Sequence, residues 1–253
     1  MRLGGFTFAI ILTGLGTLPA SAQALGENLS ALQIAIACAP PPVAAKERPD
    51  AIRVLGAQAS EPKTILGQTD RLVLSGGSAR GIAVGQEYFI RRLIVDPAVP
   101  GKKDRAWPVH TSGWITIVAV SETTAIATVR NMCSAIGNGD YLDPFERPNP
   151  PPNVEVVNMT GQLDFGALGR VLSGNDDHYN STVGEFILID QGADRGFAPG
   201  AAIAVYRDPE EKGLPLVAIG EAAVVSVGPA MSLVRVNLAT TEIRTGDYVV
   251  PRR

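Results

Sequence analysis

Two stretches that lie far apart in this sequence share one pattern of glycines: residues 77–85 read GSARGIAVG and residues 192–200 read GADRGFAPG. Glycine adopts positive φ and allows close backbone contact, so the pattern favours a chain corner after a β-strand. We expect Ile82 and Phe197 to plug the ends of small barrels, and Pro199 with Gly200 to form a type II turn. The predicted corner residues are Gly77, Gly81, Gly85, Gly192, Gly196 and Gly200.

A phosphate-binding loop is the functional alternative for such a pattern. A P-loop requires Gly-Lys followed by Ser or Thr before a helix, and a dinucleotide-binding fingerprint also opens a helix. Neither stretch continues in this way. The glycines therefore indicate backbone geometry, and we expect no cofactor.

The similarity between the two halves extends well beyond the glycines. Residues 53–56 resemble 170–173, and an apolar run precedes each glycine stretch, at 72–74 and at 186–189. Further on, residues 113–120 match 220–227, and the paired ends read Gly-Asp-Tyr at 139–141 and 246–248. Between the glycine stretch and residues 113–120 the first copy is longer, within 94–108, where Pro, Gly and Lys are typical of a surface hairpin loop. We interpret this as an internal duplication.

Each copy contains about six short apolar segments separated by turn signals, without a long amphipathic helix. Six short strands bury two faces most simply by closing on themselves. The sequence thus predicts an all-β fold with two tandem small β-barrel-like or sandwich-like modules. The expected divisions are a signal peptide at 1–22, a Pro-rich lead-in at 23–50, modules at 51–146 and 168–253, and a Pro-rich linker at 147–167.

The first 22 residues have the layout of a secretory signal: Arg2, an apolar stretch, and the small residues Ala20-Ser21-Ala22. An uncleaved anchor is the alternative, although several glycines and Pro19 weaken a continuous span. After cleavage the mature chain would have no membrane span and would lie in the periplasm or cell envelope. The segment 23–38 fits a helix or a strand equally well, and Pro40-Pro41-Pro42 ends either one.

The chain has two cysteines, Cys38 and Cys133. In an oxidising compartment two lone thiols more often pair than stay free. We therefore predict a Cys38–Cys133 disulfide; two buried free thiols are the alternative.

The second copy also carries a family-like pattern, formed by Asp190, Gly192, Gly196, Phe197, Gly200, Tyr206, Arg207, Gly220, Gly246 and Asp247. It resembles the carboxy-terminal β region of bacterial envelope proteins that carry a peptidoglycan-binding LysM module. It is more weakly similar to the carboxy-terminal domain of the flagellar H-ring protein and to the β-domains of the rod-shape scaffold protein. The resemblance implies a β fold and an envelope location. No LysM segment precedes the modules, so it does not imply peptidoglycan binding.

Several side chains are candidates for a functional role. The basic loop residues Lys102, Lys103 and Arg105 with Trp107 could contact anionic glycans or headgroups, or could simply keep a hairpin tip soluble. His110 near Ser112 lacks a nucleophile elbow and is expected to make ordinary hydrogen bonds. Asp176-Asp177-His178 supplies too few ligands for a defined site, so no metal is expected.

These observations favour a non-catalytic, exported cell-envelope protein that acts as a structural or adaptor module through strand edges and loops. A protein that binds peptidoglycan or another glycan is the alternative, and an enzyme is a third possibility. The net charge of −3 argues against a nucleic-acid partner. The sequence identifies neither the envelope partner nor the oligomeric state.

Overall fold

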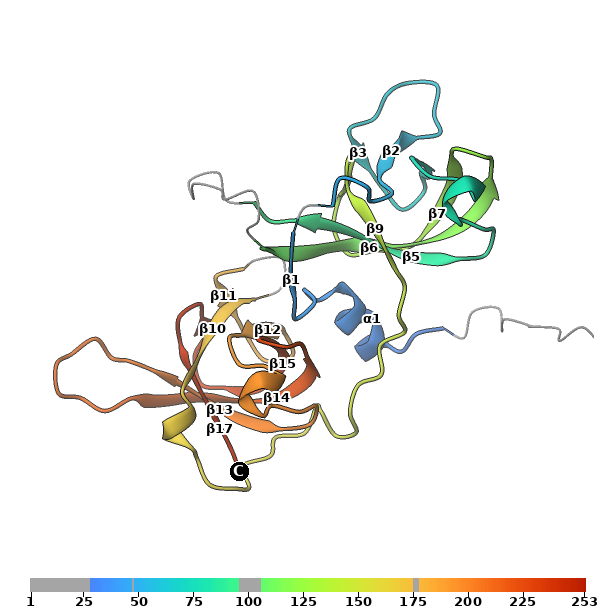
Figure 1. Cartoon of the computed structure of the whole chain (residues 1–253). Coiled ribbons are helices and arrows are strands. Elements are labelled where there is room, and N and C mark those ends of the chain that lie inside the picture. The colour runs from blue at the N-terminus through green and yellow to red at the C-terminus, as the bar shows by residue number, and fades with distance from the viewer. Residues whose placement is uncertain (1–27, 47, 96–105, 175–177) are drawn as a thin grey trace, which may run out of the picture.

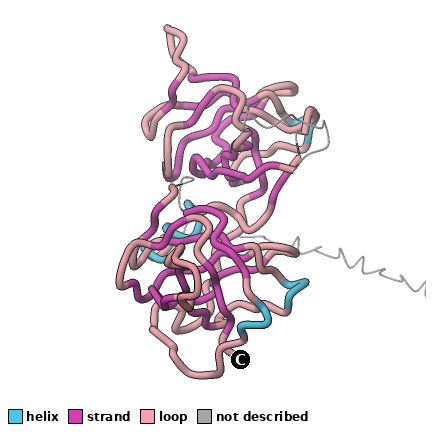
Figure 2. Tube along the Cα trace, turned by 90° about the vertical axis from the view of Figure 1, so that its left-hand side faces the viewer, coloured by secondary structure: helices cyan, strands magenta, loops and turns pink. Residues whose placement is uncertain are grey.

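The structure is a computed structural model that describes residues 28–46, 48–95, 106–174 and 178–253 (Figure 1). The expected signal peptide at 1–22 and most of the basic loop lie outside the described residues. The described chain forms two β modules with a short helix between them (Figures 1 and 2). The prediction of an all-β fold is confirmed.

The first module is a curled antiparallel sheet with the strand order β2-β4-β7-β6-β5-β9. Its two ends meet where Arg53, just before β2, bridges to Tyr141 in β9, and the Val54 amide donates to the Asp140 carbonyl at 2.8 Å. A short strand of the lead-in, β1, pairs with β6, and a small β3–β8 pair lies beside the main sheet. The strands are β1 (Ala44–Ala45), β2 (Val54–Ala57), β3 (Ile65–Leu66), β4 (Arg71–Leu74), β5 (Glu87–Leu93), β6 (Trp107–Val120), β7 (Ala125–Met132), β8 (Ile136–Gly137) and β9 (Tyr141–Pro144).

The second module is a closed barrel with the order β10-β12-β15-β14-β13-β17. Its strands are β10 (Gly169–Gly174), β12 (Phe186–Ile189), β13 (Ala202–Arg207), β14 (Val217–Val227), β15 (Ser232–Ala239) and β17 (Tyr248–Pro251), with a side pair of β11 (Asn180–Ser181) and β16 (Ile243–Arg244). Taken in chain order, these strands are connected as in the first module. A shared strand order is what an internal duplication predicts, while common ancestry itself stays a prediction.

Alternating side chains fill both interiors. Leu72 and Leu74 of β4 point into the first core, and Ile187 and Ile189 of β12 occupy the matching places in the second. Because alternate residues of a strand face opposite sides, the remaining residues of these strands face outward.

The glycine stretches form corners, as predicted. Each begins a short 3₁₀ turn, η1 (Ser78–Arg80) or η4 (Ala193–Arg195). A Cβ on Gly192 would lie 2.4 Å from the Pro229 carbonyl oxygen, so close backbone contact requires glycine there. Gly200 has φ of +86°, and the Ala201 amide donates to Ala198, which fits a type II turn with Pro199. The apolar residues Ile82 and Phe197 are buried in the two cores.

The segment whose structure the sequence left open forms a helix, α1 (Ala31–Cys38). Ser30 caps it: its hydroxyl accepts from the Gln33 amide at 3.2 Å, and the Gln33 side chain accepts from the Ser30 amide at 2.9 Å. The helix stops at Ala39, before three prolines. Among the described residues, no helix is long and apolar enough to cross a membrane.

Helix α1 lies between the modules and packs against both (Figure 1). On one face, buried Ala37 contacts the cluster of Phe89 and Trp114 on the first module. The other face, with Leu32, Ala35 and Ile36, packs against outward-facing residues of the second module: Phe186, Leu188, Ala223, Val225 and Leu233. A helix that is apolar on several sides is stable when it is covered on several sides. The short helix therefore joins the two modules.

The Pro-rich linker runs close to the second module. Val154 is buried in the same cluster as α1, and the Asn237 side-chain amide donates to the Val154 and Val156 carbonyls, both at 3.0 Å. Near the start of the linker, Gln33 of α1 donates to the Pro148 carbonyl at 2.9 Å. Downstream, η2 (Phe165–Ala167) leads into β10.

Candidate functional site

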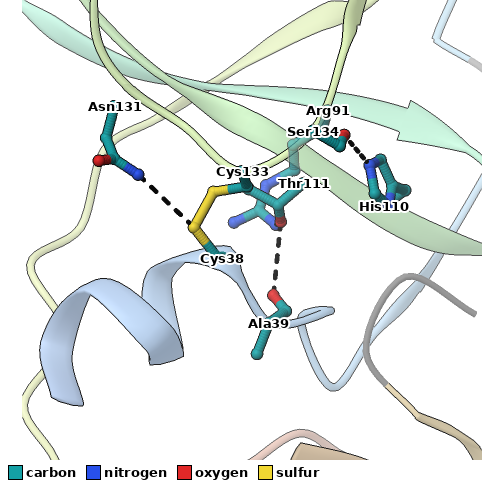
Figure 3. The surroundings of a disulfide bond; sticks show 8 residues. All are labelled: Cys38, Ala39, Arg91, His110, Thr111, Asn131, Cys133 and Ser134. Atoms are coloured by element: carbon teal, nitrogen blue, oxygen red, sulfur yellow. Dashed lines mark hydrogen bonds between the residues drawn. A yellow bond between two sulfur atoms is a disulfide. The ribbon is translucent and has the colours of Figure 1, made fainter. Parts of the chain in front are cut away.

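The predicted disulfide is present: Cys38 at the end of α1 bonds to Cys133, just after β7 (Figure 3). Beside it, the Asn131 amide nitrogen lies 3.7 Å from the Cys38 sulfur, and the Thr111 hydroxyl lies 3.5 Å from the Ala39 carbonyl. The bond fixes the end of α1 to the first module. It thereby sets where the chain turns into the lead-in strand β1.

The candidate His110–Ser112 pair is not formed. Ser112 is buried, and its hydroxyl donates to Asp140 at 3.0 Å. His110 instead lies beside Ser134, with 2.6 Å between Nε2 and Oγ (Figure 3). The pair is half-buried and its members come from β6 and from the turn after β7. No sequence pattern connects these two residues, which lie 24 positions apart.

The other sequence candidates do not form a site in the described residues. Lys102, Lys103 and Arg105 lie outside them, whereas Trp107 opens β6, is half-buried and pairs with Ala45 of β1. Asp176 and Asp177 also lie outside, and His178 is exposed. Within the described parts of the chain, no group of three His, Cys, Asp or Glu residues could hold a metal ion.

The structure reveals a pocket where the lead-in crosses the first module, which we call the Arg91 pocket. Its volume of about 310 Å³ is at the lower end of the range for small-molecule sites. Arg48 and Lys46 come from the lead-in, Arg91 from β5, and Tyr141 and Asp143 from β9. The apolar lining consists of Pro41, Val43, Ala45 and Val109.

One carboxylate and two guanidinium groups meet in this pocket. The Arg91 Nε lies 3.3 Å from one oxygen of Asp143, and Arg48 pairs with the other oxygen. Arg91 also donates to the Thr111 hydroxyl at 2.8 Å and lies over the ring of Phe89, while Arg48 lies over the ring of Tyr141. The Arg91 side chain is only 12% exposed, and burial lowers the pKa of its guanidinium from the usual value. Its charge is therefore poorly solvated.

In the described part of the second module, the positions of Arg91 and Asp143 carry uncharged side chains. Strand pairing places Arg91 opposite Tyr141 in the first module and Tyr206 opposite Tyr248 in the second. Tyr206 is packed edge-on against Phe165, 5.3 Å away between ring centres. The position of Asp143 is likewise taken by Val250, which is buried. The same place on the barrel is therefore charged and hollow in one module and aromatic in the other.

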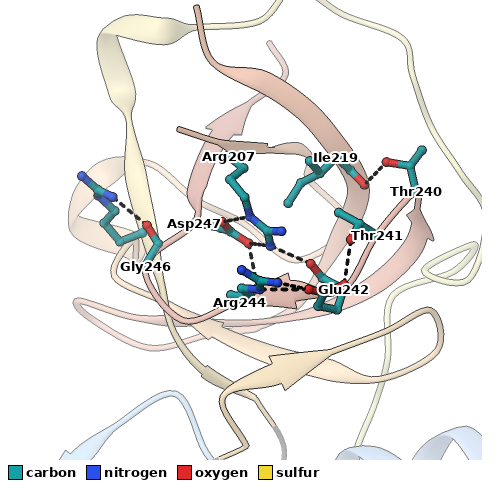
Figure 4. Close-up of polar contacts among 9 residues, drawn as sticks. Arg207, Ile219, Thr240, Thr241, Glu242, Arg244, Gly246 and Asp247 are labelled. Atoms are coloured by element: carbon teal, nitrogen blue, oxygen red, sulfur yellow. Dashed lines mark hydrogen bonds and ion pairs between the residues drawn. The ribbon is translucent and has the colours of Figure 1, made fainter. Parts of the chain in front are cut away.

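The arginine that follows in the chain, Arg92, does have a counterpart in the second module, Arg207. Arg92 binds Asp140 through Nε at 2.7 Å and Nη2 at 2.9 Å. Arg207 binds Asp247 in the same two-pronged way at 2.9 and 2.7 Å (Figure 4). Each guanidinium also donates to a nearby backbone carbonyl, that of Ala135 or of Glu242. This repeated ion pair is structural. It links β5 to the turn before β9 in the first module, and β13 to the turn before β17 in the second.

Sequence reasoning missed Arg48, Arg91, Tyr141 and Asp143 as a group. A signal was available, because the repeat aligns Arg91-Arg92 with Tyr206-Arg207 and so marks Arg91 as the position that differs. The lead-in residue Arg48 has no partner in the repeat and could not have been found this way.

Comparison with known proteins gives no relative: no protein-family model matches the chain, and no curated protein has a significant match.

Proposed function

We propose that this chain is a non-catalytic, exported cell-envelope protein that acts as a structural or adaptor module. The observation that carries the proposal is helix α1, which packs against both β modules and is fastened to the first by the Cys38–Cys133 disulfide. In the described residues a single α-helix packs against both β modules. This arrangement fits a spacer that presents loops and pockets at fixed positions.

Two further features support an envelope location. The first 22 residues have the layout of a secretory signal, and a disulfide persists where the surroundings are oxidising. The resemblance to the β region of LysM-type envelope proteins points the same way. We therefore propose the periplasm or the cell envelope, with an envelope protein as the partner.

Affinity capture tests this proposal. The tagged chain is expressed with its own first 22 residues, cross-linked in living cells, and recovered from the envelope fraction. We expect one or a few envelope proteins to be enriched over a variant in which both links of α1 to the first module are removed by Ala37→Glu together with Cys38→Ser and Cys133→Ser. Recovery in the cytosol alone, or an identical set of proteins with both forms, would contradict it.

Glycan binding is the alternative outcome and has a separate test. The purified protein is sedimented with purified cell-wall sacculi from which proteins have been removed. Under the adaptor proposal the protein stays in the supernatant. Saturable sedimentation that soluble wall fragments compete away would replace the adaptor proposal with glycan binding.

The His110–Ser134 contact favours one other function, hydrolysis, because a histidine within hydrogen-bond reach can activate a serine hydroxyl. A fluorophosphonate probe, which labels activated serines, distinguishes the two functions. The adaptor proposal predicts no labelling. Labelling that disappears in Ser134→Ala would instead assign an enzyme.

A further inference from the structure

We propose that the Arg91 pocket binds the free carboxylate of a peptide that has a small apolar side chain next to that carboxylate. The inference rests on the proposed function as a binding module and names the ligand class of its pocket. It follows from the charge, the shape and the lining of the pocket.

The first step concerns charge. Among the described residues that line the pocket, three side chains are cationic, Lys46, Arg48 and Arg91, and one is a carboxylate, Asp143; Glu47 lies outside the described residues. Asp50 and Glu146 lie near enough to influence Arg48 and Arg91 respectively, but neither lines the pocket. Among the described residues, the Arg91 contacts engage Nε and Nη1, and no hydrogen bond engages Nη2. A guanidinium with remaining donors in a poorly solvated site binds carboxylates well.

The second step concerns geometry. Arg48 and Arg91 already converge on Asp143, one on each carboxylate oxygen. The contacts of Asp143 thus show that these two guanidinium groups, although they come from different segments, can bind the two oxygens of one carboxylate in this pocket. A ligand carboxylate would share or replace Asp143 as their partner.

The third step concerns the lining. Pro41, Val43, Ala45 and Val109 provide an apolar wall beside the charged end. An aliphatic side chain gains free energy against such a wall, because it leaves water. A sugar acid would instead present hydroxyl groups to it, and the ring of Tyr141, a natural sugar platform, is covered by Arg48 and only 6% exposed. The lining therefore favours a peptide over an acidic glycan.

The fourth step compares the modules. The structural ion pair Arg92–Asp140 has its copy in Arg207–Asp247, whereas Arg91 and Asp143 are replaced by Tyr206 and Val250. A charged group is costly to bury, and the second module has the uncharged Tyr206 and Val250 at these two positions. The fold thus does not require the charges of the Arg91 pocket, which is consistent with a ligand-binding role.

The test measures binding of N-acetyl-Ala-Ala and of its carboxamide to the purified protein by NMR titration and calorimetry. We expect the acid to bind. The carboxamide should bind at least about tenfold more weakly, because the amide loses the charge-assisted hydrogen bonds. Equal binding of the two, or no shift of pocket resonances up to the solubility limit of the acid, would overturn the proposal.

Variants with opposite expected effects guard against simple misfolding. Arg91→Gln should weaken binding of the acid about tenfold or more, and Asp143→Asn should strengthen it, because the competing internal carboxylate is gone. Arg170→Gln is the matched control: Arg170 lies over Tyr248 in the second module as Arg48 lies over Tyr141, but Tyr206 stands there at the position of Arg91. Weaker binding in Asp143→Asn, or an equal loss in the control, would contradict the assignment.

A final arm separates the sources of the carboxylate. Galacturonic acid and inorganic phosphate are titrated under the same conditions. The proposal predicts that both bind more weakly than N-acetyl-Ala-Ala. Tighter binding of galacturonic acid would assign the pocket to acidic glycans, and equal binding of phosphate would reduce it to a general anion site. These measurements use only purified protein, so they can fail while the envelope capture succeeds, and the reverse.

Discussion

At the residue scale, one ion pair is repeated with its surroundings. Asp140 accepts from Arg92, from the Ser112 hydroxyl and from the Gly137 amide at 3.0 Å. Asp247 accepts from Arg207 and from the Arg244 amide at 2.7 Å (Figure 4). Both aspartates are nearly buried, so their charges depend on these donors. Each aspartate links strand β5 or β13 to the turn before the last strand of its module, β9 or β17.

We predict that Asp140→Asn lowers the free energy of unfolding of the first module by about 3 kcal/mol, because a donor group replaces an acceptor among buried donors. Both tryptophans of the chain lie in β6, so denaturant unfolding followed by tryptophan fluorescence reports on this module. The exposed Glu122→Gln, between β6 and β7 of the same module, is the control and should change stability by about 0.5 kcal/mol at most. An equally small effect in Asp140→Asn would show that the pair is not structural.

A second residue-scale prediction concerns pH. Hydrogen bonds from the Thr241 hydroxyl, and then from Arg244, lower the pKa of Glu242 from its usual 4.5 to about 2. A carboxyl whose pKa is lower in the folded state stabilises that state above its unfolded pKa, and this contribution disappears as the pH falls from 4.5 towards 2. NMR titration of the Glu242 carboxyl carbon should show the low midpoint. Arg244→Gln should raise it, and an ordinary midpoint in the unaltered protein would refute this explanation.

At the element scale, α1 is the contact between modules. Ala37 is 4% exposed and touches Phe89 and Trp114, whereas Ala31 at the start of the same helix is exposed. We predict that Ala37→Glu opens the apolar contact of α1 with Phe89 and Trp114, because the change buries an unpaired carboxylate, while the disulfide still holds Cys38 to Cys133. In a Trp107→Phe background, the emission of Trp114 should shift to longer wavelength. Ala31→Glu, the same substitution on the same helix, should leave the emission unchanged; a shift of similar size there would contradict the packing.

The disulfide is the second link at this scale. It joins residues 95 positions apart and so restricts the unfolded chain strongly. Replacing both Cys38 and Cys133 with serine should lower the free energy of unfolding by about 2–4 kcal/mol. Thermal and denaturant unfolding, compared with the unaltered protein, measure the loss. The serine variant should still show α1 protected from hydrogen exchange, because the apolar contacts of its two faces remain.

At the scale of the whole molecule, equal topology does not produce equal surfaces. In the second module, α1 packs against Phe186 and Leu188, which face outward from β12. In the first module, strand β4 has the exposed Arg71 at the position of Phe186. The first module instead receives α1 on Phe89 and Trp114, from β5 and β6. The helix therefore joins two different faces of two modules with the same strand order.

Much of this could be predicted from the sequence. The repeated glycines, the apolar runs and the two cysteines predicted the β modules, their corners and the disulfide, because these features depend on local backbone geometry and on the single way to pair two thiols. The helical state of 31–38 could not be decided, because both periods fitted and packing from two sides settles it. The Arg91 pocket could not be found either, since it joins the lead-in to β5 and β9 across the fold.

The central claim is that α1 holds the two modules together as one body, and ¹⁵N relaxation of backbone amides tests it most directly. The account predicts one rotational correlation time for amides of both modules in the unaltered protein, corresponding to their combined size. When Ala37→Glu is combined with serine in place of both Cys38 and Cys133, so that both links of α1 to the first module are lost, the modules should show two shorter correlation times. Two short, unequal correlation times in the unaltered protein would contradict the account.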